Sequence, residues 1–135
     1  MAHRVTKTIE FCYGHRLLDY EGKCRYLHGH NGLLEVEVEA EALDARGMVM
    51  DFSDLRDLVK GWVDAHLDHQ MLLWRRDAVV PLLRELGEPF YLMDENPTAE
   101  NISKLIYRQM RQMGLKLSAV RLWETPTSFA TYRED

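Results

Sequence analysis

The chain has 135 residues, of which 46% are hydrophobic and 29% charged, and its formal net charge is −5 at pH 7. This size and balance predict a single domain over residues 1–135 with an ordinary hydrophobic core. The negative charge argues against a nucleic-acid-binding surface. The longest apolar runs are too short to span a membrane, and residues 1–6 lack the apolar core of a signal peptide. We therefore expect a cytoplasmic protein with no membrane or nucleic-acid partner.

The first half of the chain predicts strands. Residues 5–11 alternate between apolar and polar side chains, as in a half-buried strand that runs towards His15. Residues 18–24 are expected to form a loop. Residues 34–41 alternate aliphatic side chains with glutamates, which predicts a strand with one solvated carboxylate face. Turn residues at 44–47 followed by the apolar residues 48–50 predict a hairpin or a bulged continuation.

Two long helices are predicted further along the chain. Ser53 is the expected N-cap of the first, whose apolar positions recur at spacings of three and four up to Leu67. Thr98 is the expected N-cap of the second, and Gly114 ends it. The intervening segment 70–96 is less regular. Residues 78–86 favour a short helix and residues 88–92 a short extended piece.

Residues 117–125 and 128–132 predict two final strands. Strands followed by helices and then strands indicate an α+β fold. We expect an antiparallel four-stranded sheet with two helices on one face. The aliphatic side of residues 34–40 should pack beneath those helices, leaving the glutamates on the opposite face of the sheet.

A candidate metal site lies between Cys24 and His30. If residues 28–30 are extended, His28 and His30 project from the same side of the strand. His15 is the candidate third ligand, and three histidines with an open position describe a catalytic zinc site. His-Gly-His could instead be a polar turn. The spacing leaves the Cys24 thiol free for chemistry.

Other polar residues leave alternatives open. His66 and His69 could form a second metal pair, although no third ligand is evident nearby. Cys12 is expected to act as a small buried hydrophobe. Arg16, Lys23 and Arg25 flank the histidines, so they either attract an anionic small molecule or are ordinary solvated cations.

From near residue 5 to near residue 132, the chain resembles the family of 6-pyruvoyl-tetrahydropterin and 6-carboxy-tetrahydropterin synthases. The motifs that carry the resemblance are Phe11 to Leu17, Cys24 with His28-Gly29-His30, Leu67-Asp68-His69, Pro97 to Asn101 and Trp123-Glu124-Thr125. Five motifs in the right order and at roughly the right spacing make the match specific.

The resemblance implies a function for each motif. It implies zinc on His15, His28 and His30, a catalytic Cys24, and proton transfer by Asp68 and His69. It implies Glu124 as the pterin anchor, with Thr98 and Glu100 beside the substrate. It further implies the tunnelling fold, in which trimers close their sheets into a barrel and two trimers stack as a homohexamer.

The resemblance also suggests a reaction. The spacer between Cys24 and His28 has three residues, and this length resembles that of the bacterial queuosine-pathway enzymes. We therefore expect a zinc-dependent lyase that converts 7,8-dihydroneopterin triphosphate to 6-carboxy-5,6,7,8-tetrahydropterin. The alternatives are a 6-pyruvoyl-tetrahydropterin synthase, which stops after triphosphate elimination and internal redox, and a non-catalytic scaffold that binds zinc and pterin. Segment 70–96 is longer than in the short bacterial members, which predicts a remodelled pocket wall or oligomer contact.

Overall fold

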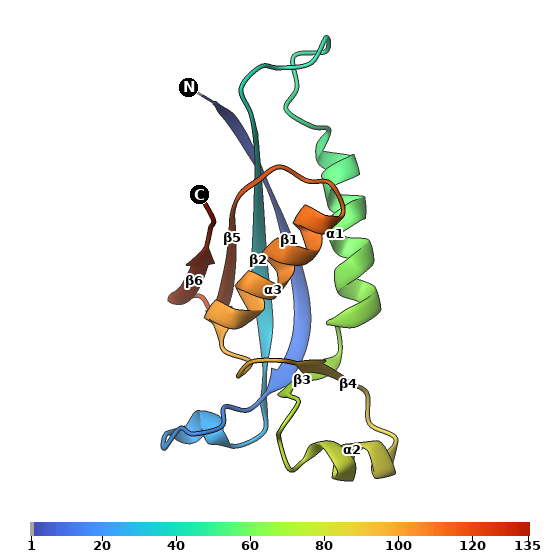
Figure 1. Ribbon diagram of the computed structural model, residues 1–135, viewed down its shortest axis with the longest axis vertical. Coiled ribbons are helices and arrows are strands. Elements are labelled where there is room, and N and C mark those ends of the chain that lie inside the picture. The colour runs from blue at the N-terminus through green and yellow to red at the C-terminus, as the bar shows by residue number, and fades with distance from the viewer. Residues whose placement is uncertain (1) are drawn as a thin grey trace.

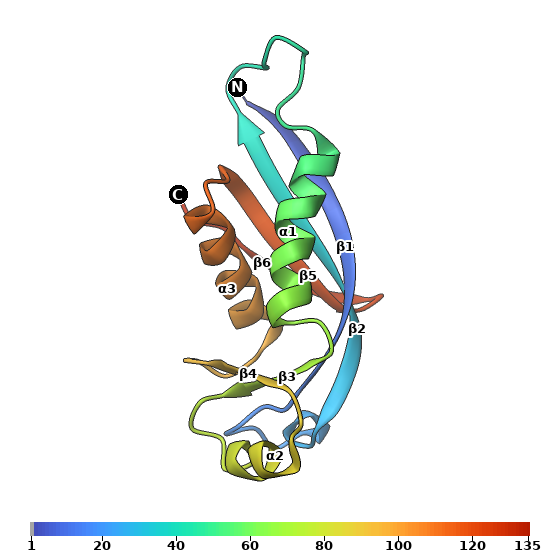
Figure 2. The same cartoon turned by 90° about the vertical axis from the view of Figure 1, so that its right-hand side faces the viewer.

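The computed structural model describes residues 2–135. Six strands form one curved sheet in the order β4-β3-β1-β2-β5-β6. Helices α1 and α3 lie side by side on one face of this sheet, whereas α2 and the short η1 turn lie at one end of the molecule (Figures 1 and 2). The elements in chain order are β1 (His3–His15), η1 (Lys23–Arg25), β2 (His28–Ala40), α1 (Phe52–His66), β3 (Gln70–Trp74), α2 (Val80–Leu86), β4 (Phe90–Met93), α3 (Ala99–Gln112), β5 (Leu117–Thr125) and β6 (Ser128–Tyr132).

The long antiparallel pair of β1 and β2 is the backbone of the sheet. Its register runs from His3 opposite Ala40 to His15 opposite His28. Strand β5 pairs antiparallel with β2, and β6 pairs antiparallel with β5. These four strands confirm the predicted antiparallel sheet, and β5 and β6 have the predicted bounds. The register brings His15 of β1 and His28 and His30 of β2 to the same end of the sheet.

The sheet is larger than expected and mixed in direction. Strand β3 pairs parallel with the end of β1, and β4 pairs parallel with β3. The prediction of four antiparallel strands and two helices was therefore incomplete, because segment 70–96 contributes two strands and α2. Leu72 and Leu73 are fully buried, so this segment extends the core. Helix α2 begins close to its predicted start, with Pro81 in its first turn.

Two local predictions were wrong. The N-cap of α1 is Asp51, whose carboxylate accepts a hydrogen bond from the Ser53 amide at 2.7 Å. Residues 48–50 form no strand, because the Asp44 carboxylate accepts hydrogen bonds from the amides of Arg46 and Met48 and holds the chain in a turn. The predicted N-cap of α3 is confirmed, since the Thr98 side chain accepts from the Asn101 amide.

The alternation along β2 separates the core from the open face. Leu34, Val36 and Val38 are buried beneath α1 and α3, as predicted. Glu37 points away from this core and binds Arg121 and Ser118 at 3.1 and 2.7 Å. Although burial acts in the opposite direction, these partners hold the pKa of Glu37 below its ordinary value. The carboxylate face is thus partly ion-paired rather than simply solvated.

In the part of the chain that the structure describes, every helix is too short or too polar to cross a membrane.

Candidate metal and substrate site

Three histidine rings meet where β1 ends and β2 begins. His15 lies opposite His28 in the register, and Tyr13 lies opposite His30, so all four side chains share one face of the sheet. Ring centroids are 4.5 Å apart for His15 and His28, 5.0 Å for His15 and His30, and 5.1 Å for His28 and His30. One nitrogen from each ring lies within 4.8 Å of the other two. The predicted cluster is therefore a group that could hold a metal ion.

Backbone carbonyl groups fix how two of the rings are protonated. The Nδ1 atom of His15 lies 2.7 Å from the Pro97 carbonyl, and that of His28 lies 2.7 Å from the Tyr26 carbonyl. A carbonyl only accepts, so each Nδ1 carries the hydrogen and each Nε2 is left with a lone pair in the neutral ring. Burial lowers the pKa of His15 to about 4, which keeps this ring neutral at physiological pH.

The Nε2 atoms are arranged as metal ligands. Those of His15 and His30 are 3.1 Å apart, and the buried Nε2 of His28 has no hydrogen-bond partner. The His15–His30 contact is a hydrogen bond when the His30 Nε2 carries the hydrogen, whereas the orphaned buried nitrogen of His28 is unfavourable alone. A divalent ion between the three rings would satisfy all three nitrogens. The residues present fit such an ion.

The loop before α3 holds the His15 side of the cluster. The Asn96 side chain accepts from the Leu18 amide at 3.0 Å and donates to the Leu18 carbonyl at 2.9 Å. The Asn101 side chain donates to the Asn96 carbonyl at 2.9 Å. This clamp fixes the peptide of Pro97, whose carbonyl orients His15. The sequence analysis identified the motif Pro97 to Asn101, but it did not predict that the Pro97 carbonyl orients His15.

Glu124 lies beside the cluster. Its carboxylate oxygens are 3.9 Å from the His15 Nε2 and 4.0 Å from the His30 Nε2. The Tyr13 hydroxyl donates to the same carboxylate at 3.5 Å. Tyr13 was not predicted as a site residue, although the alternation of β1 places it on the face of His15. Burial, followed by the charge of Glu124, raises the pKa of Tyr13, so the phenol stays neutral and remains a donor.

Asp68 and His69 form the expected pair. The Asp68 carboxylate lies 2.8 Å from the His69 Nδ1, and it also accepts from the Cys12 amide at 3.0 Å. The His69 amide donates to the Cys12 carbonyl at 2.6 Å. Burial opposes ionisation, but the Cys12 amide and His69 hold the pKa of Asp68 below its ordinary value. Asp68 therefore orients the His69 ring through its Nδ1 atom.

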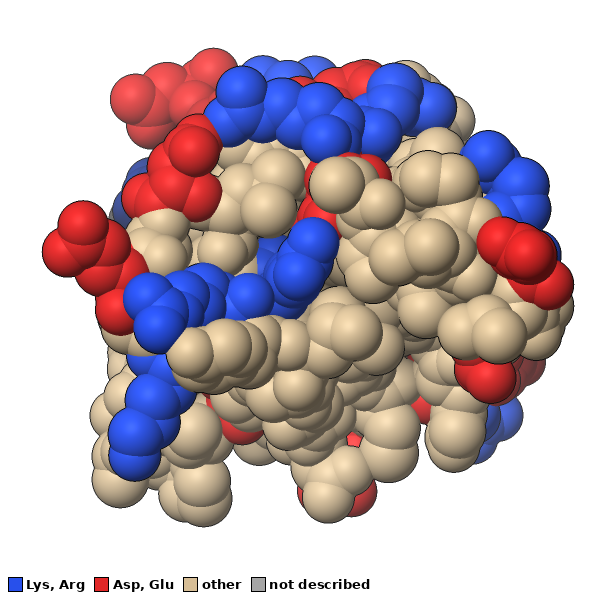
Figure 3. All heavy atoms as spheres, turned by 90° about the horizontal axis from the view of Figure 1, so that it is seen from below, with Lys and Arg blue, Asp and Glu red and all other residues tan. Residues whose placement is uncertain are grey.

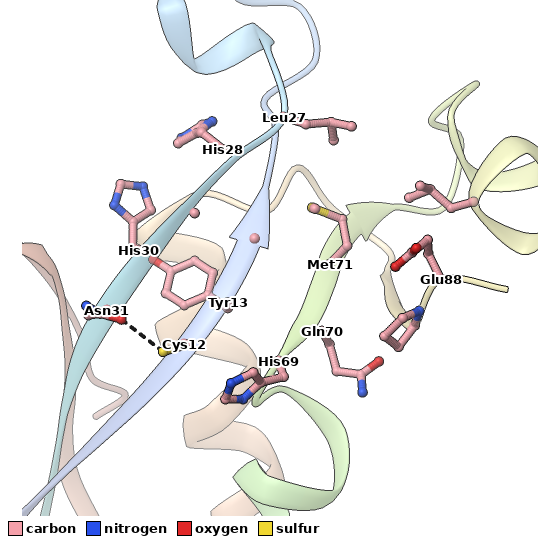
Figure 4. Close-up of a pocket in the computed structure, with 14 residues that line it drawn as sticks. Cys12, Tyr13, Leu27, His28, His30, Asn31, His69, Gln70, Met71 and Glu88 are labelled. Carbon is pink, nitrogen blue, oxygen red and sulfur yellow. Dashed lines mark hydrogen bonds between the residues drawn. The ribbon is translucent and has the colours of Figure 1, made fainter. Parts of the chain in front are cut away.

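A pocket of about 670 Å³ is lined by residues of both groups (Figure 4). His28, His30 and His69 all line it, as do side chains from α2 and the segment before β4. Cys12 lines it too, with its sulfur 2.9 Å from the Asn31 side-chain oxygen. Cys12 is half-buried rather than a buried hydrophobe, because β1 turns it to the face opposite Tyr13. Segment 70–96 forms part of the pocket wall through Gln70, Met71, Leu83, Glu88 and Pro89.

The remaining predicted residues do not line this pocket. Cys24 is half-buried in η1, where its carbonyl accepts from the Leu17 amide at 2.8 Å. Thr98 uses its hydroxyl to cap α3. Glu100 is exposed and lines, together with Glu124, a second pocket formed by the start of α3 and by β6.

Basic side chains gather at this end of the molecule (Figure 3). Arg16, however, is not a free cation. Its guanidinium donates to the buried carboxylate of Asp77 at 2.8 Å, and Asp77 also accepts from the Val79 amide. Burial raises the pKa of Asp77, but Arg16 outweighs this effect and holds it below its ordinary value. The pair ties the end of β1 to the start of α2, while Lys23 and Arg25 remain exposed.

Comparison with known proteins points in one direction. A sequence model described as 6-pyruvoyl tetrahydropterin synthase matches residues 4–135. Over 93% of this chain and 96% of the relative, the chain is 36% identical to a 6-carboxy-5,6,7,8-tetrahydropterin synthase of Rickettsia bellii. It is 34% identical to the protein of the same name from Haemophilus influenzae, over 97% of this chain and 99% of the relative.

Solved structures share the fold. An uncharacterized protein from Wolinella succinogenes superposes with a TM-score of 0.84 and 28% identity, over 100% of this chain and 99% of that chain. The 6-pyruvoyl tetrahydropterin synthase of Caenorhabditis elegans superposes with a TM-score of 0.73 and 22% identity, over 100% of this chain and 97% of that one. The second likeness concerns the fold alone.

Proposed function

The chain belongs to the 6-pyruvoyl tetrahydropterin synthase family, and we propose that it is a zinc-dependent 6-carboxy-5,6,7,8-tetrahydropterin synthase. The substrate is 7,8-dihydroneopterin triphosphate, and triphosphate and acetaldehyde leave. Several relatives that share about a third of the residues over almost the whole chain bear this name. The observation that carries the proposal is the three-histidine cluster beside Glu124.

We assign zinc to the Nε2 atoms of His15, His28 and His30. Three neutral imidazoles leave an open position and the full double charge of the ion. Zinc bound there would act as a Lewis acid that makes the vicinal hydroxyls of the substrate side chain more acidic. The Pro97 and Tyr26 carbonyl groups support this assignment, since they hold two of the rings in the tautomer that a metal needs.

The proton transfers are assigned to Cys24, Asp68 and His69. As a thiolate, Cys24 removes a carbon-bound proton from the substrate side chain. His69 moves a proton on the other face of the substrate, and Asp68 orients its ring and stabilises its charged form. The 2.8 Å contact between Asp68 and His69 supports this role.

Glu124 is assigned to the pterin ring. A pterin presents a ring N–H beside an exocyclic amino group, and one carboxylate accepts this pair of donors as it would a guanidinium. Thr98 and Glu100 are assigned to the same end of the substrate. Glu100 and Glu124 line one pocket, which supports their grouping.

The product distinguishes this proposal from its alternatives. Purified protein is loaded with zinc and incubated with 7,8-dihydroneopterin triphosphate, and the products are identified by mass spectrometry. We expect the 6-carboxy product with acetaldehyde. The 6-pyruvoyl product alone would indicate the other synthase, and intact substrate bound to protein would indicate a scaffold.

A cysteine variant tests the assignment of the base. Cys24→Ala should abolish turnover while its zinc content equals that of the parent, because mere binding needs no thiol base. Loss of zinc in this variant would make Cys24 a ligand. Equal turnover by the variant and the parent would remove Cys24 from the mechanism.

The proposed assembly is a homohexamer of two trimers, with sites at subunit interfaces. Strands β4 and β6 are the edges of the sheet, and edge strands are prone to pair with other chains. Ring closure would turn the glutamate face of β2 towards the lumen. Mixing inactive Cys24→Ala and His69→Ala proteins under subunit exchange should restore partial activity if His69 completes a neighbouring site. No recovery, with exchange confirmed by mass, would mean that each site is built within one chain.

A further inference from the structure

We propose that Tyr13 is a positioning residue that holds the Glu124 carboxylate in place for the pterin and away from the open position of the metal. The inference rests on the proposed function, since it concerns the same site. Its basis is the hydrogen bond from the Tyr13 hydroxyl to Glu124 at 3.5 Å, next to two of the metal-ligating rings.

The place of Tyr13 is built into the hairpin. Only 3% of the residue is exposed. Its ring stacks on Phe11 at 5.2 Å and meets His15 edge-on at 5.3 Å. Gly32 leaves room for the ring, because a Cβ atom there would lie 3.0 Å from a Tyr13 ring carbon and 3.2 Å from Leu122. Packing on all sides fixes the direction of the hydroxyl, so the hydroxyl can in turn fix a carboxylate.

Glu124 needs such a restraint because it lies close to where a fourth metal ligand would sit. Neighbouring ligand atoms of a tetrahedral zinc site are about 3.4 Å apart, given metal–nitrogen bonds of about 2.0–2.1 Å. The Glu124 oxygens are 3.9 and 4.0 Å from the Nε2 atoms of His15 and His30. A small movement would bring the carboxylate onto the ion, to which its charge attracts it. It would then block the position that the substrate hydroxyls need.

The hydroxyl opposes this movement. The donor is a neutral phenol and the acceptor a carboxylate, and the 3.5 Å between them is at the long limit of a hydrogen bond, so the restraint is that of an ordinary bond rather than of a short charge-assisted one. Among the described residues, the Tyr13 hydroxyl donates a hydrogen bond to the Glu124 carboxylate. The Glu124 side chain is 26% exposed, so it has room to move. Removing the hydroxyl should let Glu124 bind the metal in the substrate-free protein and weaken the binding of the pterin.

The test compares Tyr13→Phe with the matched control Tyr107→Phe. Tyr107 is also a buried tyrosine, with 4% exposure, and its hydroxyl donates to the Leu117 carbonyl at 3.4 Å, away from the cluster. Each protein is loaded with cobalt(II), and its visible absorption spectrum is recorded without substrate. We expect an altered spectrum for Tyr13→Phe and the parental spectrum for Tyr107→Phe. The parental spectrum in both variants would overturn the proposal.

Binding of 7,8-dihydroneopterin, followed by pterin fluorescence, gives the second readout. We expect its Kd to rise by up to about tenfold in zinc-loaded Tyr13→Phe, the size of one lost ordinary hydrogen bond. In turnover assays the KM should rise more than kcat falls. In a Glu124→Gln background the tyrosine substitution should have no further effect, because the amide has no charge to draw it to the metal. An undiminished effect in that background would refute action through Glu124.

The outcomes also separate this inference from the proposed function. If the parent neither binds 7,8-dihydroneopterin nor turns over its triphosphate, the proposed function fails. If the parent does both and Tyr13→Phe behaves like the parent, only the role of Tyr13 fails.

Discussion

Removing the Asn96 side chain should weaken both the fold and the metal site. Asn96 holds Leu18 by two hydrogen bonds, at 3.0 and 2.9 Å, and thereby fixes the loop that follows His15. It also precedes Pro97, whose carbonyl orients the His15 ring. The substitution Asn96→Ala deletes both bonds but retains the backbone carbonyl to which the Asn101 side chain donates.

The expected magnitudes follow from these contacts. Two neutral, partly buried hydrogen bonds contribute about 1 kcal/mol each, so the free energy of unfolding should fall by about 2 kcal/mol. Changes in the groups that orient metal ligands typically weaken metal binding by about 10–100-fold. Asn96 acts on His15 through the Pro97 peptide rather than directly, so we expect a loss near the lower limit, about tenfold.

Two assays measure these effects. Urea unfolding of the metal-free protein gives the stability change, and competition with a fluorescent chelator gives the zinc affinity. Asp94→Ala is the matched control in the same loop, because its side chain is 86% exposed and pairs only with Arg75 among the described residues. We expect the control to match the parent in both assays. Parental zinc affinity in Asn96→Ala, together with a clear loss of stability, would refute the link from Asn96 to His15.

Two further predictions concern stability. Asp77→Asn leaves Arg16 without its charged partner. Because the Arg16 side chain is 26% exposed, water should limit the loss in free energy of unfolding to about 2–3 kcal/mol, measured by urea titration. A loss near zero would show that the pair does not tie α2 to β1. The lowered pKa of Glu37 makes its contribution fully present above the ordinary glutamate pKa and lost as the pH falls through the folded value. Acid titration of Glu37→Gln should therefore show a smaller loss of stability below about pH 4 than the parent, and parallel curves would contradict this.

The predictable parts of the fold are those with a regular period. The alternation in β2 and the helical spacing in α1 and α3 each gave the correct element, because burial of one face determines the structure there. Segment 70–96 was less predictable, since β3 is a five-residue strand whose parallel partner is set by tertiary contact with the end of β1. Ser53 was misassigned as a cap because Asp51, two residues earlier, offers the stronger acceptor.

The site divides in the same way. The three histidines were predictable, because their spacing on two strands carries the signal. The Pro97 carbonyl and the Tyr13 hydroxyl were not, since a backbone carbonyl has no sequence signature and a tyrosine in a strand usually packs in a core. Both depend on contacts between residues that are far apart in the chain: His15 and Pro97 are separated by 82 positions, and Tyr13 and Glu124 by 111.

The most direct test of the proposed zinc site is a zinc titration of metal-stripped protein in which product formation is followed at each addition. We expect no turnover without metal and a linear rise that ends at one zinc per chain, with the 6-carboxy product formed throughout. We also expect that a His15→Gln variant neither retains zinc nor gains activity, whereas His66→Gln, on the exposed side of α1, titrates like the parent. Full turnover by the stripped protein would contradict the zinc-dependent function, as would one tightly bound zinc in the His15 variant.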